Sequence, residues 1–352
     1  MSAPLSQGYL KTPDGHEVYY MEFGNPRAMA AVVLHGGPGS SANLAMLDWF
    51  DLTRWRIVLF DQRGCGRSRP AGSLENNTTD HLVADIERLR AHLNIGAWVV
   101  VGGSWGAFLA LAYAARHPSA INHLLLRGVF LPSERQLSWF FQDLRALVPQ
   151  AWEDLTFNMT SAEKNSVMQT LVGSLLGNDP SAQAAAASRW GCYEDRVMAV
   201  LAQRNLALDA CADENKARFE IGSDHAEHSE LASATFAIQK NASDDNFSGQ
   251  SDLYPGKTPA IARRINKFRI QSHYLQHRCF VDLSVLLPRV GECGINLTLV
   301  HGTHDWICPP ENVHFLLRFL RNPEVCWVKG GTHTTSDRLI AGALARKLSR
   351  LV

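Results

Sequence analysis

A sharp turn between a buried strand and a helix constrains this chain most. In WVVVGGSWGAFLALAYAARHP, residues 98 to 118, the first four residues predict a short buried strand. Residues at helical spacing follow, and these are Leu109, Ala112, Tyr113 and Arg116. The bend between strand and helix therefore falls on Gly-Gly-Ser-Trp-Gly, residues 102 to 106. Small residues are common at such bends, so an ordinary structural turn is one interpretation, and a G-x-S-x-G turn that exposes Ser104 is the other.

The second interpretation gives Ser104 a chemical role. Such a turn strains the serine backbone, and its glycines avoid collisions with the neighbouring strand and helix. The N–H of Trp105 would then point to where a carbonyl oxygen gathers negative charge, and the N-terminus of the helix would add a favourable dipole. A second N–H is available in the motif HGGPG, where Gly36 or Gly37 is the expected donor and His35 is expected to support the loop.

Strand-like and helical segments alternate through the first 130 residues. HEVYYMEF alternates along its length, AMAAVVLHGGPG and WRIVLFDQRGCG each run from a buried strand into a turn, and INHLLLRGVFLP predicts a strand that ends near Arg127. In TTDHLVADIERLRAHLNI the N-cap is expected at Thr78, Thr79 or Asp80. One face of that helix carries Leu82, Val83, Ile86, Leu89 and Leu93. The alternation predicts an α/β fold with a mainly parallel central sheet covered by helices.

The middle of the chain has a different pattern. From about Ser133 to Cys293 the segments are helical and rich in Trp, Phe, Leu and Ala, and strand signals return in INLTLVHG and EVCWVKGG. We therefore expect a helical cap, residues 133 to 293, inserted between two parts of the α/β core, residues 1 to 132 and 294 to 352. Residues 241 to 259 are polar and rich in Ser, Asp, Gly and Pro, which predicts an exposed loop without an evident role.

Composition excludes several classes of function. Lys plus Arg and Asp plus Glu both number 34, and this balance argues against a nucleic-acid or anionic-membrane partner. The sequence offers no pattern of a signal peptide and no run of eighteen apolar residues, so a cytoplasmic protein is expected. The seven cysteines lack C-x-x-C spacing, which predicts reduced thiols rather than a disulfide framework or a zinc site. No metal or cofactor is expected, and the oligomeric state stays open.

The chain offers partners for a nucleophilic serine. A serine hydroxyl needs a histidine base, and the histidine needs a carboxylate that fixes its tautomer. Asp305 follows the predicted strand LTLVHG and His333 follows the next, so both are expected on the same sheet edge as Ser104. An aspartate near a histidine often caps a helix instead, which applies to Asp337 as well. Position after the penultimate strand favours Asp305.

Six segments of the chain form a specific combination. They are HGGPG at 35 to 39, DQRGCGRS at 61 to 68, NTTDHLVADIERLRAHL at 77 to 93, GGSWGAFLALAYAARHP at 102 to 118, LLLRGVFL at 124 to 131 and HGTHDWICPP at 301 to 310. Together they resemble the segments of one family, the prolyl aminopeptidases, which are α/β-hydrolase serine peptidases also called proline iminopeptidases. The resemblance implies an α/β-hydrolase fold with an inserted helical cap. It also implies Ser104 as nucleophile, Asp305 as the residue that orients the base, and His333 as the base.

The predicted cap carries a patchier resemblance. LSWFFQDLRALVPQAW is similar to the family's aromatic segment beside the proline pocket, which implies substrate contacts for Trp139, Phe140 and Phe141, although plain cap packing is an alternative for each. SRWGCYED resembles the segment whose glutamate holds the free amino terminus of the substrate, which implies that role for Glu194.

A second family glutamate has no counterpart here. It lies in a segment that resembles ARIENHYF, and this chain reads FRIQSHYLQHRCF, so Gln271 stands where the carboxylate belongs and Tyr274 follows as a further candidate for substrate contact. A neutral amide accepts a hydrogen bond from an ammonium group but adds no charge, and charge-assisted bonds are about twice as strong as neutral ones. One of two anchors is therefore weakened.

We expect a serine hydrolase that releases N-terminal proline, or a similar small residue, from short peptides through an acyl-enzyme on Ser104. An amidase, esterase or lactonase that acts on a small molecule with the same three residues is the first alternative, and Gln271 favours it. A ligand-binding protein without catalysis on this fold is the second, and the intact Ser-Asp-His set counts against it.

Overall fold

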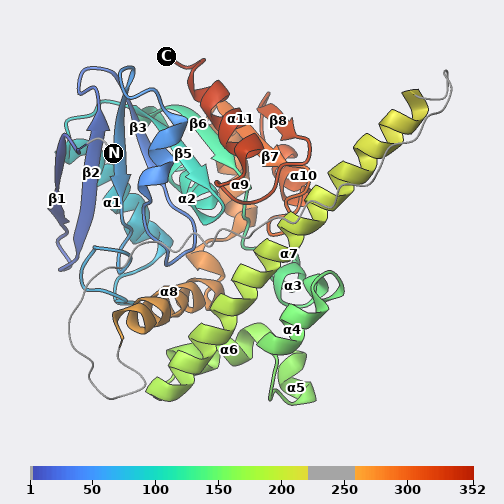
Figure 1. Cartoon of the computed structure of the whole chain (residues 1–352). Coiled ribbons are helices and arrows are strands. Elements are labelled where there is room, and N and C mark those ends of the chain that lie inside the picture. Colours follow the sequence, from blue (N-terminus) through green and yellow to red (C-terminus); the bar gives the residue numbers. More distant parts are fainter. Residues whose placement is uncertain (1–2, 221–257) are drawn as a thin grey trace.

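The computed structural model describes residues 3 to 220 and 258 to 352. Eight strands form one sheet in the order β1-β2-β4-β3-β5-β6-β7-β8 (Figure 1). The strands are β1 (Ser6–Lys11), β2 (Glu17–Gly24), β3 (Met29–Leu34), β4 (Trp55–Phe60), β5 (Trp98–Gly103), β6 (Ile121–Arg127), β7 (Leu297–Gly302) and β8 (Glu324–Val328). β2 pairs antiparallel with β1 and with β4, and all other neighbours are parallel. This sheet confirms the predicted mainly parallel α/β fold.

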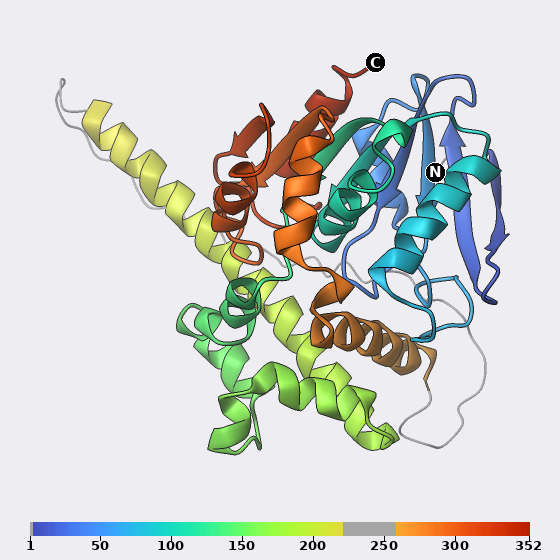
Figure 2. The same cartoon turned by 180° about the vertical axis from the view of Figure 1, so that it is seen from behind.

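Helices cover both faces of the sheet. α1 (Thr79–His92), α2 (Trp105–Ala114) and α9 (Leu283–Glu292) lie over one face (Figure 2), where they share a buried cluster with Val100. α11 (Arg338–Leu348) and the 3-10 helix η1 (Leu44–Trp49) pack on the other face, in a cluster that contains Val99 and Val101. Successive β5 residues therefore point into different clusters, as expected for a strand buried on both sides. α10 (Glu311–Leu317) connects β7 with β8.

The helix before β5 begins and packs as predicted. Thr78 is the N-cap, and its side chain accepts a hydrogen bond from the N–H of His81. The five apolar residues of the predicted face are buried. α2 differs from the amphipathic pattern, because every residue from Trp105 to Ala114 is buried. The sheet covers one side of α2 and the neighbouring helices α1 and α9 cover the other, so no polar face is required.

The N-terminal strands depart from the sequence analysis. β1 has no counterpart in the predicted elements, and β2 was expected to alternate between buried and exposed residues. Residues 18 to 23 of β2 are all buried, because the sheet is covered on both faces here as well. Even Glu22 is only 7% exposed, and its carboxylate pairs with Arg56.

The described elements between residues 134 and 276 are all helical. They are α3 (Glu134–Phe141), α4 (Pro149–Leu155), α5 (Ser161–Lys164), α6 (Val167–Leu176), α7 (Pro180–Glu220) and α8 (Pro259–Gln276), together with the short 3-10 helix η3 (Asp143–Ala146). In both views these helices lie beyond one edge of the sheet, and α8 packs against α6 and α7 (Figures 1 and 2). The predicted loop at residues 241 to 259 lies, except for its last two residues, outside the described ranges.

One helix of the predicted cap belongs by its packing to the core. α9 falls within residues 133 to 293, but it packs against α2 on the face of the sheet. Its buried residues Leu286, Leu287 and Val290 extend the same hydrophobic cluster as α1 and α2. The helical segment that stands away from the sheet therefore ends near Gln276, ahead of the predicted boundary.

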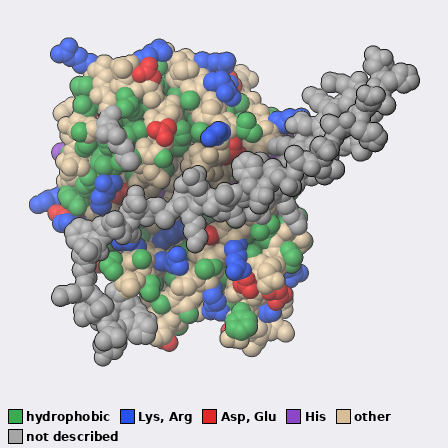
Figure 3. All heavy atoms as spheres, viewed as in Figure 1, with side chains coloured by type: hydrophobic (Ala, Val, Ile, Leu, Met, Phe, Trp, Pro, Cys, Tyr) green, Lys and Arg blue, Asp and Glu red, His purple; other side chains and the backbone are tan. Residues whose placement is uncertain are grey.

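The surface carries charges of both signs. Figure 3 shows Lys and Arg side chains together with Asp and Glu side chains on one face, with hydrophobic and other residues between them. This mixture agrees with the equal numbers of basic and acidic residues, 34 each. Within the described residues, no helix has the length and hydropathy needed to cross a bilayer.

Candidate active site

Ser104 occupies the strained turn that its motif predicts. It lies between the last residue of β5 and the first residue of α2, and its backbone has φ 56° and ψ −123°. A positive φ is costly for a residue with a Cβ atom and persists where the surrounding structure enforces it. The N–H of Ser104 donates to the carbonyl oxygen of Arg127 at 3.0 Å, which ties the turn to the end of β6.

Two glycines make this turn possible. A Cβ atom on Gly102 would lie 2.4 Å from the carbonyl oxygen of Gly106, and one on Gly106 would lie 2.0 Å from that of Leu34. Both distances are far below van der Waals contact, and in each case the obstacle is backbone. The glycines of the motif are therefore required by the close packing of β5, α2 and β3.

Asp305 and His333 meet at the same edge of the sheet. Nδ1 of His333 lies 2.8 Å and 3.0 Å from the two carboxylate oxygens of Asp305. Asp305 follows β7 and His333 follows β8, as their positions in the sequence predict. Asp337 has another role, because its carboxylate accepts hydrogen bonds from the N–H groups of Thr332 and Leu339 and caps α11. Of the two aspartates considered, Asp305 contacts the histidine.

The surroundings of Asp305 keep it ionised. Burial alone would raise its pKa, but the charge and hydrogen bond of His333, the nearby His301 and the N–H of Cys308 together lower the pKa below its ordinary value. Nδ1 of His333 contacts a carboxylate that only accepts hydrogen bonds, so this nitrogen carries the proton. Nε2 of His333 is then left as the basic nitrogen.

Arg127 links the loop that carries His333 to the turn that carries Ser104. Its Nη1 donates to the carbonyl oxygen of His333 at 2.6 Å, and its own carbonyl oxygen accepts from Ser104. Burial lowers the pKa of Arg127, against the raising effect of the Asp305 carboxylate. The end of β6 therefore fixes the loop of His333 relative to the turn of Ser104.

The HGGPG loop is attached to the serine turn through side chains. His35 is buried, its Nδ1 donates to the carbonyl oxygen of Gly36 at 2.9 Å, and its Nε2 accepts from the N–H of Gln62 at 3.0 Å. The side-chain amide of Gln62 donates a hydrogen bond to the carbonyl oxygen of His35 and accepts one from the indole N–H of Trp105. Burial lowers the pKa of His35, so the ring stays neutral. These bonds agree with the supporting role predicted for His35.

The neighbouring DQRGCGRS segment has a structural role. Asp61 accepts hydrogen bonds from the N–H groups of Ala42 and Arg67, and Arg63 pairs with Asp85 of α1. Asp61 therefore fixes the turn after β4, and Arg63 attaches that turn to the first helix.

A cavity of about 250 Å³ lies above Ser104. The residues that the sheet-edge loops contribute include Gly36, Gly37, Ser40, Ser104, Arg127, Cys308 and His333. The remaining lining residues are Phe130, Gln136, Leu137, Phe140, Phe141, Glu194, Met198, Lys267, Gln271, Leu275 and Ile307. Apolar and aromatic side chains surround a few polar groups, which is the usual composition of a site for a small ligand.

The cavity contains most, but not all, of the predicted substrate contacts. Phe140, Phe141, Glu194 and Gln271 line it. Trp139 does not, because its indole N–H donates to the Trp306 carbonyl and its ring stacks on that of Trp306. For this residue the alternative of plain packing describes the structure.

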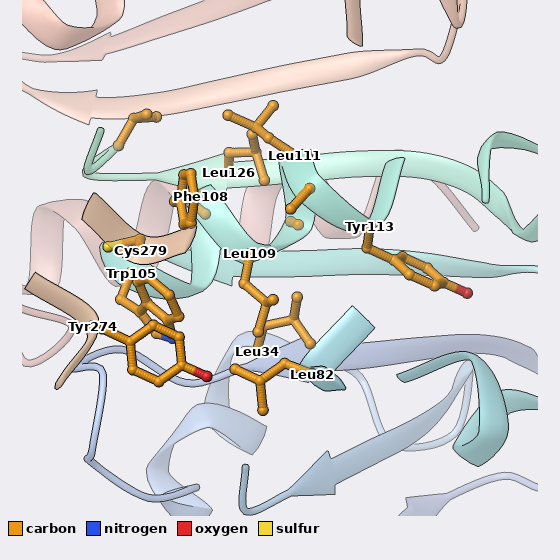
Figure 4. Close-up of a cluster of buried hydrophobic side chains, with 14 of the residues drawn as sticks. Leu34, Leu82, Trp105, Phe108, Leu109, Leu111, Tyr113, Leu126, Tyr274 and Cys279 are labelled. Atoms are coloured by element: carbon orange, nitrogen blue, oxygen red, sulfur yellow. The ribbon is translucent and has the colours of Figure 1, made fainter. Parts of the chain in front are cut away.

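Tyr274 is a second residue that lies elsewhere. Its ring packs edge-on against Trp105 at 4.8 Å between centroids, in the buried cluster beneath the serine turn (Figure 4). Its hydroxyl donates to the Asn77 side chain at 2.8 Å, and burial raises its pKa well above normal. Tyr274 therefore lies outside the cavity lining, contrary to the prediction that it contacts substrate, because its side chain packs on Trp105 and bonds to Asn77.

Glu194, Gln271 and Lys267 form one polar cluster in the cavity. Nε2 of Gln271 donates to Oε1 of Glu194 at 3.0 Å, and Nζ of Lys267 pairs with Oε2 at 2.7 Å. The sequence analysis did not identify Lys267. The sequence did contain a signal for it. Lys267 precedes Gln271 by four residues, and residues four apart on a helix lie on the same face.

Cys308 was also missed as a site residue. Its thiol lines the cavity and lies within hydrogen-bonding reach of Ser104, while burial raises its pKa well above normal. Its N–H donates to Asp305. A position three residues after the aspartate was the only signal in the sequence.

Comparisons with known proteins agree with this geometry. A family model described as the alpha/beta hydrolase fold matches residues 32–333. A probable proline iminopeptidase of Leptolyngbya boryana is 31% identical, with 99% of this chain and 95% of that protein covered. A proline iminopeptidase of Xylella fastidiosa (strain 9a5c) is 34% identical, with 88% and 84% covered.

A solved structure is similar in fold. MGS-M2, an alpha/beta hydrolase enzyme from a Medee basin deep-sea metagenome library, gives a TM-score of 0.59 over 98% of this chain and 97% of that chain, at 16% sequence identity.

Proposed function

Because the chain belongs to the α/β-hydrolase family and, within it, to the proline iminopeptidases, we propose that it is a serine hydrolase that releases N-terminal proline, or a similar small residue, from short peptides. One observation carries the proposal: Ser104, His333 and Glu194 line the same cavity. A nucleophile, a base and a carboxylate for the substrate amine thus share one small space. The proposal includes a cytoplasmic location and a helical cap that runs from residue 133 to about residue 276, because α9 packs with the core.

The proposed chemistry is acyl transfer through Ser104. Nε2 of His333 takes the proton of the serine hydroxyl, which attacks the carbonyl carbon of the first residue. The N–H groups of Trp105 and of Gly36 or Gly37 hold the oxyanion. His333 then gives the proton to the leaving amine, and water, activated by the same histidine, hydrolyses the acyl-enzyme. Asp305 stabilises the positively charged imidazolium throughout.

The proposed substrate contacts explain removal from the N-terminus. The side chains of Phe140 and Phe141 offer apolar surface for a proline ring. The carboxylate of Glu194 accepts a hydrogen bond from the terminal amine, and Gln271 offers a neutral acceptor beside it. A cavity of about 250 Å³ has room for one small residue, and the chain that follows must extend out of it.

Peptide digestion tests the proposal directly. A tripeptide with proline first should release free proline, and its isomer with proline second should release none, because only a terminal residue fits between Glu194 and Ser104. An active-site serine probe should label Ser104 in the folded wild type and should not label Ser104→Ala. Release of proline that persists in Ser104→Ala would contradict the nucleophile assignment.

A small-molecule amidase, esterase or lactonase is the second candidate. The amide of Gln271 in place of a carboxylate favours it, because the amine anchor is weaker than two carboxylates would be. Such an enzyme would be labelled at Ser104 and hydrolyse simple amides or esters, but would release no proline from either tripeptide. A ligand-binding protein without catalysis would show neither labelling nor hydrolysis.

A further inference from the structure

The amine anchor of the cavity is already paired with a cation of the protein. Both oxygens of Glu194 are engaged, one by Nε2 of Gln271 at 3.0 Å and the other by Nζ of Lys267 at 2.7 Å. Glu194 comes from α7, and the two partners lie four residues apart on α8. The side chains of Lys267 and Glu194 are 33% and 20% exposed, so the pair is partly shielded from water.

This pair removes the net charge of the anchor. Glu194 contributes one negative charge, Lys267 one positive charge, and Gln271 none. Among the side chains that the structure describes, the other cation that lines the cavity is Arg127, and the carboxylate of Asp305 lies behind His333. A protonated amine that enters must therefore compete with Lys267 for Glu194 or remain beside a like charge. Like charges a few ångströms apart repel more strongly where water is partly excluded.

One acceptor in the cluster has no partner. Oε1 of Gln271 is buried and forms no hydrogen bond within the described residues, although the residue lines the cavity. A buried carbonyl without a partner is costly, so a side-chain rotation that offers this oxygen to a ligand N–H in the cavity would be favoured. The amide of Gln271 is neutral, so it does not offset the positive charge that Lys267 brings to Glu194.

We propose that Lys267 is a specificity-determining residue that reduces the preference of the cavity for a protonated N-terminus. The inference rests on the proposed function, because it takes Glu194 as the group that receives the substrate amine. With Lys267 in place, a positive charge on the ring nitrogen of a proline-like substrate adds less to the affinity of that substrate for the cavity. Neutral ring compounds, such as an N-acylated proline, then compete better than they would at an unpaired carboxylate.

Substitution of the lysine tests this role. Lys267→Met keeps much of the side-chain length and removes the charge, while Gln271 still holds Glu194. The ratio of kcat/KM for a chromogenic prolyl amide to that for its N-acetyl form should rise about tenfold, mainly through a lower KM for the free amine, which corresponds to about 1.4 kcal/mol. Lys267→Arg keeps the pair and should keep the wild-type ratio. Gln271→Glu should also raise the ratio, because it adds a negative charge.

A matched control exists elsewhere among the helices. Lys164 pairs with Glu153 at 3.6 Å, and its side chain is also 33% exposed, but it does not line the cavity. Lys164→Met should therefore leave the ratio at the wild-type value. Equal ratios in Lys267→Met and wild type, with both proteins folded, would overturn the proposal.

An inhibition assay separates this inference from the proposed function. Hydrolysis of p-nitrophenyl acetate needs Ser104, its base and the oxyanion hole but no substrate amine, and pyrrolidine, which is protonated at neutral pH, serves as the probe. Its inhibition constant should fall about tenfold in Lys267→Met, while that of neutral N-acetylpyrrolidine should change less than about threefold. This result in an enzyme that does not cleave prolyl substrates would support the role of Lys267 and contradict the proposed function. An unchanged constant for pyrrolidine would overturn the role of Lys267 whatever the prolyl activity.

Discussion

At the scale of single residues, the site depends on which aspartate faces His333. Asp305 approaches Nδ1 at 2.8 Å and is buried, whereas Asp337 is bound to backbone N–H groups at the start of α11. Position after a strand predicted this difference, because parallel strands end at one edge. The side on which a cap residue points could not be predicted in this way, and Trp139 and Tyr274, which were candidates for substrate contact, lie outside the cavity lining. Lys267 was missed because its partner Glu194 is distant in the sequence.

Replacement of Asp305 tests its role at this scale. In Asp305→Asn the amide can donate to Nδ1 of His333, which favours the wrong tautomer, and kcat should fall by about 10⁴ with the fold retained. Asp337→Asn is the control, since asparagine also caps helices and this residue does not contact the histidine. Its kcat should stay within about threefold of the wild type. Similar losses in both variants would mean that Asp305 has no special relation to the base.

At the scale of elements, the turn between β5 and α2 depends on the close packing of β5, α2 and β3. The motif predicted it well, because glycine, serine and glycine at this spacing are uncommon without close backbone packing. The N-cap of α1 was also predictable, since Thr78 precedes the apolar pattern. β1 was not found, because its sequence SQGYLK has little apolar content, and of its six residues only Leu10 is buried. Its pairing with β2 supplies the stability that its side chains do not.

Two glycines within helices give a matched test of this packing. Gly106→Ala would place a methyl group 2.0 Å from the Leu34 carbonyl oxygen, so the free energy of unfolding should fall by about 3 kcal/mol or more. A methyl group on Gly173 in α6 would meet no atom within 4 Å, and Gly173→Ala should raise the free energy of unfolding by about 0.5 to 1 kcal/mol. Urea denaturation measures both. A small effect of Gly106→Ala would show that β3 can move away from α2.

At the scale of the whole molecule, the order of elements predicted the sheet and its two covered faces. The pattern of apolar runs separated by helices leaves few topologies for a parallel sheet. The extent of the segment that stands away from the sheet was less predictable, because α9 is amphipathic like the helices before it. Only its contact with α2 shows that it belongs to the core.

The folded molecule should lose stability as the pH falls below neutrality. Burial, as the largest cause, lowers the pKa of His35, His123, His273 and His301. In the unfolded chain these histidines bind protons as the pH falls through about 6.5, whereas in the folded chain they bind protons only at lower pH. Because the unfolded state then binds more protons, the free energy of unfolding falls as the pH falls through that value. The urea midpoint should therefore be lower at pH 5.5 than at pH 7.5.

Single histidine variants check this cause. His123→Gln removes one of the four histidines and should reduce the decrease in the urea midpoint between pH 7.5 and pH 5.5. His314→Gln removes an exposed histidine and should leave the loss nearly unchanged. A midpoint that is the same or higher at pH 5.5 in the wild type would contradict the account.

The most direct measurement is kcat/KM for a chromogenic prolyl amide with a free amine, in the wild type and in Ser104→Ala. The account predicts steady turnover by the wild type and a loss of at least about a thousandfold in the variant, because without the serine only binding and the oxyanion hole remain. Turnover that survives in Ser104→Ala, or a wild type that hydrolyses simple esters but not the prolyl amide, would contradict it.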